Sequence, residues 1–292
     1  MNTVTLSFDK YLQKLNSGTL DSSASYEIEG NAHVFGKQGI TLLGLTFRGS
    51  IEISSDSQDI ILQDCKIKGD VTCAAHGVVI KNCTAHAISL FKGATNVLVA
   101  KCATDSINLT WAYNCTAILN SIGSVSVCES KNIYVIENTV SGDIFLSGTA
   151  YLLCDGNKVN GEVENNGCTE YNGDNVCRVK ARLAAGAEGE LLPHVNKDLF
   201  LEMPMREYVL QAEYENPTTF NEYLLSEAER SETVIIPPGA YRAREKIQAT
   251  SAHSNTVIYA YGAMRENVDY GPAIDIDATD HFSIRGLTVG YA

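Results

Sequence analysis

The sequence predicts an all-β fold in which short strands wind into a parallel β-solenoid, and three observations lead to this prediction. Segments of about ten residues recur between residues 40 and 161, and one register position returns every 18 to 20 residues. Within each repeat, apolar residues pair two positions apart, which is the period of a strand. Longer segments with the 3.6-residue apolar period of a helical repeat do not occur in this part of the sequence.

Each repeat contains three such apolar pairs, so each turn of the solenoid is expected to hold three strands. Strands of successive turns would stack at ~4.8 Å, and the repeats predict about seven turns. The register position that defines these turns is occupied by Leu45, Cys65, Cys83, Cys102, Asn120, Asn138 and Asn157. Asparagine is tolerated in such an inward column because stacked amides can hydrogen-bond from one turn to the next.

A short helix is predicted before the repeats, over residues 7–18. Ser7 is suited to the N-cap position and Gly18 to the C-terminal stop. The apolar side of this helix is formed by Phe8, Tyr11, Leu12 and Leu15. Such a helix can cover the open end of a solenoid and hide the edge of its first strands.

A second module of the same design is predicted after the first. The motif FDKYL at residues 8–12 recurs as FNEYL at 220–224, and GLTF at 44–47 recurs as GLTV at 286–289. The second copy therefore repeats the order of cap helix, connecting strands and first turn.

Three domains follow from this comparison. Residues 1–177 form an N-terminal parallel β-helix, 178–217 form a linker that packs on the solenoid, and 218–292 form a cap helix and the first turn of a second β-helix. A solenoid that stops after one turn leaves an open strand edge. We therefore expect the chain to be the front part of a longer protein, and expect self-association through this edge.

The charge of the chain excludes some classes of partner. The formal net charge is −13, and the acidic residues are spread over both modules. Binding to a nucleic acid backbone requires a basic surface, so a nucleic acid partner is not expected. No apolar run approaches the length of a membrane span, and the first fifteen residues lack the pattern of a signal peptide. The localisation therefore stays open between the cytoplasm and secretion.

All nine cysteines lie between residues 65 and 177. Six of them fall on inward positions of the repeats, where cysteine acts as a small apolar residue. A buried column offers no opening for a metal ion, so no metal site is expected.

The segment SETVIIPPGAYRAREKI at residues 231–247 carries a V-x-x-P-x-G-x-Y pattern, formed by Val234, Pro237, Gly239 and Tyr241. Together with the repeat units and the inward asparagines, this pattern resembles the right-handed parallel β-helix proteins of the pectate-lyase-like superfamily. A left-handed hexapeptide β-helix would also suit steps of this length, but its strict six-residue pattern is missing. The resemblance implies a right-handed solenoid and a polysaccharide or oligosaccharide partner.

Two functions remain open on this basis. The resemblance implies a carbohydrate-associated protein, the N-terminal part of a polysaccharide-degrading enzyme, with a glycoside hydrolase favoured over a lyase. A lyase of this superfamily would often use calcium, whereas a hydrolase would need no cofactor. The alternative is a non-enzymatic solenoid for glycan binding, adhesion or assembly resembling that of phage spikes.

The candidate catalytic residues lie near the end of the chain. Asp275 and Asp277 are two positions apart and would share one side of a strand, and His281 and Arg285 follow. Glycosidases need two carboxylates that flank one bond, so the aspartates and His281 are the candidate catalytic residues and Arg285 a candidate for substrate binding. An ordinary exposed solenoid strand would show the same pattern.

Aromatic residues mark a second candidate site in the first module. Trp111 and Tyr113 lie at the corner after a third strand, and Phe91 lies one turn earlier. Aromatic rings stack on sugar rings, although they also cover solenoid corners as packing residues. Elsewhere on this module, outward positions of three successive turns are occupied by Lys68, His86 and Asp105, a conceivable acid–base group.

Overall fold

The computed structural model describes residues 3–173, 175–177, 182–183, 232–243, 246–267, 274–277 and 279–291. The chain is all-β, with 6% helix, and divides into two compact units, Met1–Leu191 and Leu192–Ala292. The predicted linker lies almost entirely outside the described residues, and the second cap helix lies wholly outside them. Each unit is described by itself.

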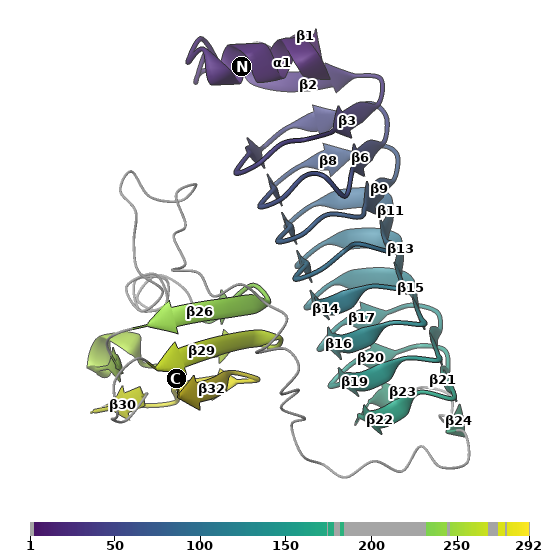
Figure 1. The fold of residues 1–292 in the computed structure, drawn as a ribbon, viewed down its shortest axis with the longest axis vertical. Helices are drawn as coiled ribbons and strands as arrows, with labels where there is room; N and C mark the ends of the chain where they lie inside the picture. The colour runs from purple at the N-terminus through teal and green to yellow at the C-terminus, as the bar shows by residue number, and fades with distance from the viewer. Residues whose placement is uncertain are drawn as a thin grey trace. The chain divides into compact units, whose positions relative to one another are not determined.

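The first unit is a parallel β-solenoid of about nine turns, and the predicted fold class is therefore confirmed (Figure 1). Two of its three columns of strands join into one sixteen-stranded sheet, the long sheet. The first column of the long sheet contains β2 (Ser25–Glu29), β5 (Thr46–Phe47), β8 (Lys66–Ile67), β11 (Thr84–Leu90), β13 (Ala103–Thr110), β15 (Ser121–Cys128), β17 (Thr139–Val140), β20 (Lys158–Val159) and β23 (Val176–Cys177).

The second column of the long sheet follows a bend in each turn. In β11, β13 and β15 the strand continues through this bend, so these three strands belong to both columns. The remaining strands of the second column are β3 (Ala32–Val34), β6 (Ile51–Ile53), β9 (Val71–Cys73), β18 (Ile144–Ser147), β21 (Val163–Asn166) and β24 (Arg182–Leu183).

The third column forms an eight-stranded sheet. Its strands are β4 (Thr41–Leu43), β7 (Ile61–Gln63), β10 (Val79–Lys81), β12 (Leu98–Ala100), β14 (Tyr113–Ile118), β16 (Lys131–Ile136), β19 (Ala150–Asp155) and β22 (Thr169–Asn172). Among the described strands, neighbouring turns pair in parallel, for example β12 with β14 and β14 with β16. The connection from the second column to this sheet, called the aromatic corner below, carries the candidate residues of the first module.

The solenoid is longer than the seven turns that the repeats predict. One additional turn, with β2 and β3, precedes the first repeat, and another, with β22 to β24, follows the last one. The final turn keeps the register, because Asn175 follows Asn157 at the same repeat position and accepts a hydrogen bond from its Nδ2 at 2.8 Å. Its first strand, β22, has the sequence TEYN, so this turn does not begin with the apolar pair on which the repeat count depends.

The predicted cap helix is present as α1 (Phe8–Asn16), which begins after Ser7. Phe8, Tyr11 and Leu12 are buried, and the Phe8 ring lies 6.3 Å from that of Phe47 between centroids. The helix is preceded by β1 (Thr3–Ser7), which pairs in parallel with β2. At the N-terminal end of the solenoid in Figure 1, α1 therefore covers the first turn, as the apolar side of the helix predicts.

The interior is filled by aliphatic side chains, alanines and thiols, and it also contains buried polar side chains, among them a column of asparagines. Asn120, Asn138 and Asn157 are at most 2% exposed. The Nδ2 atoms of Asn120 and Asn138 each donate to the Oδ1 atom of the next asparagine at 2.9 Å. The same Oδ1 atoms accept the backbone N–H of the preceding asparagine, so the buried amides satisfy both one another and the backbone.

The second unit also contains stacked parallel strands. Its three sheets are formed by β25 (Thr233–Ile235), β28 (Val257–Tyr259) and β31 (Ser283–Arg285), by β26 (Gly239–Ala243), β29 (Ala263–Asn267) and β32 (Thr288–Tyr291), and by β27 (Ile247–Ala249) and β30 (Ile274–Ile276). A short 3-10 helix, η1 (Ser251–His253), follows β27.

More turns stack in this unit than the single one that the sequence comparison identifies. Thr233 of β25 pairs with Val257 of β28, which in turn pairs with Ser283 of β31. The number of residues from one turn to the next is larger here than in the first unit, and it differs between the two steps. The sequence therefore shows no constant repeat length in this unit. Within the first turn, the buried Tyr241 hydroxyl donates to the Pro237 carbonyl at 2.6 Å, which explains the spacing of proline and tyrosine in the motif.

Candidate functional site

The aromatic corner holds a surface groove of about 400 Å³, called the aromatic groove. Its lining residues are Lys92, Trp111, Ala112, Tyr113, Glu129, Ser130 and Lys131. Trp111 directly follows β13 and has a positive φ of 53°, and its backbone N–H donates to the Cys128 carbonyl at 3.1 Å. This left-handed turn carries the chain around the corner and leaves the indole 59% exposed.

Lys131 lies one turn beyond Tyr113 in the eight-stranded sheet, directly paired with it in the register. The Lys131 Nζ atom lies 5.7 Å from the centroid of the Tyr113 ring and 6.0 Å from that of the Tyr151 ring. A cation within about 6 Å of an aromatic ring is attracted to it. The ammonium group thus connects the aromatic side chains of two separate turns.

The structure brings the three aromatic residues predicted from the sequence to one corner on successive turns. Phe91 directly follows β11 and is 44% exposed, and the neighbouring Lys92 lines the aromatic groove. Sequence reasoning missed the charged residues of the groove. Two of them could have been identified from the repeat. In the next turn, Glu129 occupies the repeat position of Trp111, and Lys131 occupies that of Tyr113.

The aromatic groove is chemically suited to binding. It offers two aromatic rings, two ammonium groups and the carboxylate of Glu129. General acid–base hydrolysis of a glycosidic bond uses a pair of carboxyl groups, whereas Glu129 is the one carboxylate among the lining residues of this groove. The arrangement therefore favours stacking and hydrogen bonding.

The aspartates predicted near the end of the chain lie on or just after β30. Asp275 Oδ2 forms an ion pair with Lys246 Nζ at 2.5 Å. Asp277 is exposed, and its backbone N–H donates to the Ala249 carbonyl at 2.9 Å, which continues the ladder between β27 and β30. The carboxylate of Asp275 is thus held by a cation from the preceding turn.

His281 and Arg285 belong to a different part of the second unit. His281 is exposed at a left-handed turn with a φ of 54°, before β31. Arg285 lies on β31, and its Cζ atom lies 5.6 Å from the centroid of the Tyr259 ring. Asp275 on β30 and Arg285 on β31 therefore belong to separate sheets.

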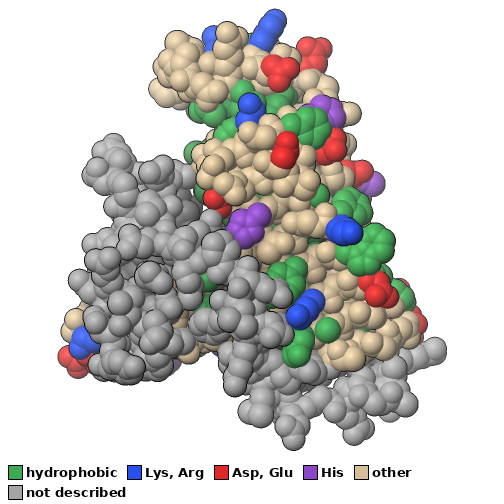
Figure 2. All heavy atoms as spheres, in the orientation of Figure 1, with side chains coloured by type: hydrophobic (Ala, Val, Ile, Leu, Met, Phe, Trp, Pro, Cys, Tyr) green, Lys and Arg blue, Asp and Glu red, His purple; other side chains and the backbone are tan. Residues whose placement is uncertain are grey.

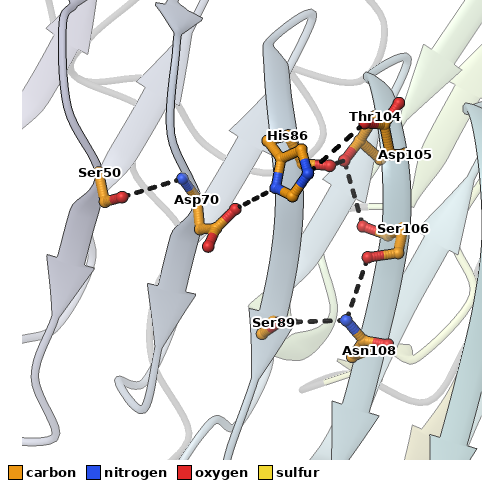
Figure 3. A network of polar contacts seen from close by, with 8 residues as sticks. All are labelled: Ser50, Asp70, His86, Ser89, Thr104, Asp105, Ser106 and Asn108. Atoms are coloured by element: carbon orange, nitrogen blue, oxygen red, sulfur yellow. Dashed lines mark hydrogen bonds and ion pairs between the residues drawn. The ribbon is translucent and has the colours of Figure 1, made fainter.

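A polar network crosses four turns of the long sheet (Figure 3). His86 Nδ1 lies 2.7 Å from Asp70 Oδ1, and His86 Nε2 lies 3.7 Å from Asp105 Oδ2. On the same turns, Thr104 Oγ1 donates to the His86 carbonyl at 3.0 Å and the Asp70 backbone N–H donates to Ser50 Oγ at 3.1 Å. The imidazole therefore bridges two carboxylates from the turns before and after it.

Asp70, and not the predicted Lys68, is the partner of His86 because the bend shortens between these turns. The register pairs Thr84 with Lys66 before the bend but Ile88 with Val71 after it, so the step between turns loses one residue. The shortening places Gly69 opposite His86, whose backbone N–H donates to the Gly69 carbonyl at 3.0 Å, and the side chain of the adjacent Asp70 reaches the imidazole. Both ring nitrogens of His86 face carboxylates at the protein surface. Neither the aromatic groove nor the groove beside α1 is lined by these three side chains, which favours a structural contact over acid–base chemistry.

The bridging geometry predicts a raised pKa of His86. The hydrogen bond to Asp70 raises it above its ordinary value most strongly, and the charges of Asp70 and Asp105 raise it further. Stabilisation from this contact is complete below the ordinary histidine pKa of ~6.5 and is lost as the pH rises through the folded-state pKa. Asp70→Asn is expected to move the pKa of His86 down toward ~6.5, as measured by NMR titration of the imidazole.

Asp105→Asn is the matched control for this titration. Asp105 lies farther from the imidazole than Asp70, so its replacement is expected to lower the His86 pKa by less. An unchanged pKa in Asp70→Asn would contradict the assignment of the shift to this hydrogen bond.

Charged side chains of both signs lie on the first unit, and some of them are paired, as Arg48 Nε lies 2.7 Å from Glu27 Oε1. Figure 2 shows lysine, arginine, aspartate and glutamate scattered over the visible face among uncharged polar surface. Among the described residues, no group of three or more histidine, cysteine, aspartate or glutamate side chains is arranged to hold a metal ion. Within the same residues, no helix combines the length and apolar character that a membrane crossing requires.

Comparison with known proteins found no match among protein-family models, curated proteins or solved structures. The functional argument therefore depends on the geometry of the chain itself.

Proposed function

We propose that the N-terminal solenoid is a glycan-binding module and that the aromatic groove holds an uncharged sugar chain. The observation that carries this proposal is the indole of Trp111, 59% exposed and placed beside Tyr113 in a groove with charged hydrogen-bonding side chains. A large exposed ring in a concave site, next to a few oriented polar groups, is the usual composition of a ligand site.

The chemistry of the groove and of the chain supports a neutral glycan. Aromatic faces stack on the apolar faces of sugar rings, and the ammonium groups of Lys92 and Lys131 and the carboxylate of Glu129 can bond to sugar hydroxyls. The net charge of −13 disfavours an acidic polysaccharide. The V-x-x-P-x-G-x-Y motif, which resembles that of pectate-lyase-like proteins, also supports a carbohydrate partner.

The polysaccharide-degrading alternative would use the second unit. A hydrolase would need Asp275 and Asp277 on either side of one bond, with His281 and Arg285 nearby. A lyase would need a basic residue and often calcium. This arrangement is not favoured, because Asp275 is paired with Lys246 and Arg285 lies on another sheet. We therefore propose glycan binding in preference to glycan degradation.

The sole tryptophan of the chain makes the proposal directly testable, because Trp111 fluorescence reports on the groove without a label. We expect a screen of neutral oligosaccharides to contain a ligand that shifts this emission. Calorimetry with that ligand should show about tenfold weaker binding to Trp111→Ala, since one aromatic stack contributes about 1.4 kcal/mol.

Phe145→Ala is the matched control, because Phe145 is also an exposed aromatic side chain but lies on β18, outside the lining of the aromatic groove. Equal affinity of the wild type and Trp111→Ala for every ligand found would refute the proposal. Release of reducing ends from the same oligosaccharides, abolished in Asp277→Asn, would instead favour the hydrolase.

A further inference from the structure

A second groove lies at the N-terminal end of the same corner. This groove, called the cap groove, has a volume of about 700 Å³ and is lined by α1 and by residues after β2 and β3, among them Asn31, His33, Phe35 and Lys37. Phe35 is 49% exposed. It directly follows β3, as Phe91 directly follows β11.

The aromatic side chain in the cap groove is held in place by its neighbours. The rings of Phe35 and His33 stack with centroids 5.5 Å apart and planes inclined by 24°. His33 Nδ1 lies 3.0 Å from Glu52 Oε2 on the next turn, which fixes the imidazole beneath the phenyl ring. The exposed ring therefore forms a pre-organised stacking platform, which limits the entropy lost when a ligand binds.

Phe35 and Phe91 occupy the same column of the solenoid. The register pairs Val34 with Ile53, Ile53 with Cys73 and Cys73 with Leu90, so the residue after each strand falls on one line. The two phenylalanines are three turns apart, which corresponds to ~14 Å at the stacking distance of parallel strands. On the next turn this column continues through Thr110, because Leu90 pairs with Leu109, and Trp111 stands one residue beyond it, level with Lys92 in the aromatic groove.

The two intermediate turns place the small residues Ser54 and Ala74 in this column. Ser55, Ala74 and Gly93 lie close together, because a Cβ atom on Gly93 would meet the Ala74 carbonyl oxygen at 2.6 Å and Ser55 Cβ at 3.6 Å. The column between the two phenylalanines therefore carries small side chains, and the Asp56 carboxylate lies beside it, where it accepts a hydrogen bond from Ser54 Oγ. The strands that lead into this column, β6, β9 and β11, are paired on both sides, so a peptide could not bind here by adding a strand.

We propose that one linear, uncharged glycan chain lies along the aromatic corner, from the aromatic groove across these two turns to Phe35 in the cap groove. This inference rests on the proposed function and extends it by defining the direction of the chain and the length of the ligand. An extended sugar chain suits this surface, because it can stack at separated aromatic rings and pass over the small side chains between them.

The test is a length series of the oligosaccharide found by the screen, from a disaccharide to an octasaccharide, titrated by calorimetry against the full chain. Short members fill the aromatic groove alone and should bind equally to the wild type and Phe35→Ala. Long members should bind at least ~10-fold more tightly than short ones to the wild type, and Phe35→Ala should lose about that factor.

Leu43→Ala is the matched control, since Leu43 is an apolar side chain of similar exposure, 54%, on β4 near the same end of the solenoid. Affinity that does not rise with length, or that is unaffected by Phe35→Ala, would overturn this inference while Trp111→Ala still weakens short ligands. If Trp111→Ala weakens neither short nor long ligands, the proposed function fails as well.

Discussion

Replacing Asn138 with alanine is expected to lower the free energy of unfolding of the N-terminal solenoid by about 3 kcal/mol or more. Asn138 is 1% exposed, and its Oδ1 accepts both the backbone N–H and the Nδ2 of Asn120 at 2.9 Å. Its Nδ2 donates to the Ala117 carbonyl at 3.0 Å and to Asn157 Oδ1 at 2.9 Å. Alanine removes the side-chain acceptor of the buried Asn120 backbone N–H and one partner each of Asn120 Nδ2, the Ala117 carbonyl and Asn157 Oδ1, and a buried polar group left without a partner costs about 1–3 kcal/mol. Urea denaturation followed by circular dichroism measures the loss.

Asn160→Ala is the control, because Asn160 is an exposed asparagine in the following turn, and its Nδ2 donates to the Ser141 carbonyl at 3.2 Å. It should change the free energy of unfolding by less than about 1 kcal/mol. A loss in Asn138→Ala no larger than in this control would show that the buried amides do not stabilise the solenoid.

Cysteine is expected to damage the column less than alanine at the same position. Earlier turns carry Cys83 and Cys102 there, and their thiols donate to carbonyl oxygens of their own and the preceding turn. The backbone N–H of Cys65 also approaches the Cys83 sulfur, as that of Asn120 approaches Asn138 Oδ1. Asn138→Cys should therefore unfold at a urea concentration between those of the wild type and Asn138→Ala.

Gly123→Ala is expected to destabilise the same unit by about 3 kcal/mol, the upper range for overpacking a rigid site. Gly123 lies at the bend of β15, next to Asp105 on the preceding turn. A Cβ atom at this position would collide with the Asp105 carbonyl oxygen, which is backbone and cannot rotate away. The bend would have to open, and thermal or urea unfolding would occur earlier.

Gly44→Ala separates this collision from the conformational preference of glycine. Gly44 has a positive φ of 66°, but a Cβ atom there would meet nothing within 4 Å. Its replacement should cost only about 1 kcal/mol, the usual penalty for the left-handed conformation. Equal losses in the two variants would contradict steric contact as the cause at Gly123.

The sequence was sufficient to predict the solenoid because its core depends on local repetition. Alternating apolar pairs and one recurring register position predict parallel stacking, and the structure pairs Val125 with Ile144 as that register requires. The cap helix was equally accessible, since Phe8, Tyr11 and Leu12 define one apolar side. The last turn was missed because its first strand, β22, does not carry the apolar pair of the repeat.

The functional residues were less accessible because they depend on offsets between turns. A one-residue shortening at the bend places Asp70, and not Lys68, against His86. The partnership of Lys131 with two tyrosines requires side chains to reach across turns, which a strand pattern does not specify. In the second unit, long and unequal steps between turns hide the stacking that the strand pairs display.

The buried asparagines also have an electrostatic consequence. From Asn120 to Asn157, each Nδ2 donates to the Oδ1 of the next asparagine toward the C-terminal end and also to a backbone carbonyl of an earlier turn. The hydrogen bonds between the amides therefore all run in one direction, as far as Asn175. Aligned hydrogen bonds polarise one another in a low-dielectric interior, and each becomes stronger for the presence of the others. The column is therefore a directional polar chain along the axis of the solenoid, in which the energies of neighbouring amides are coupled and do not add independently.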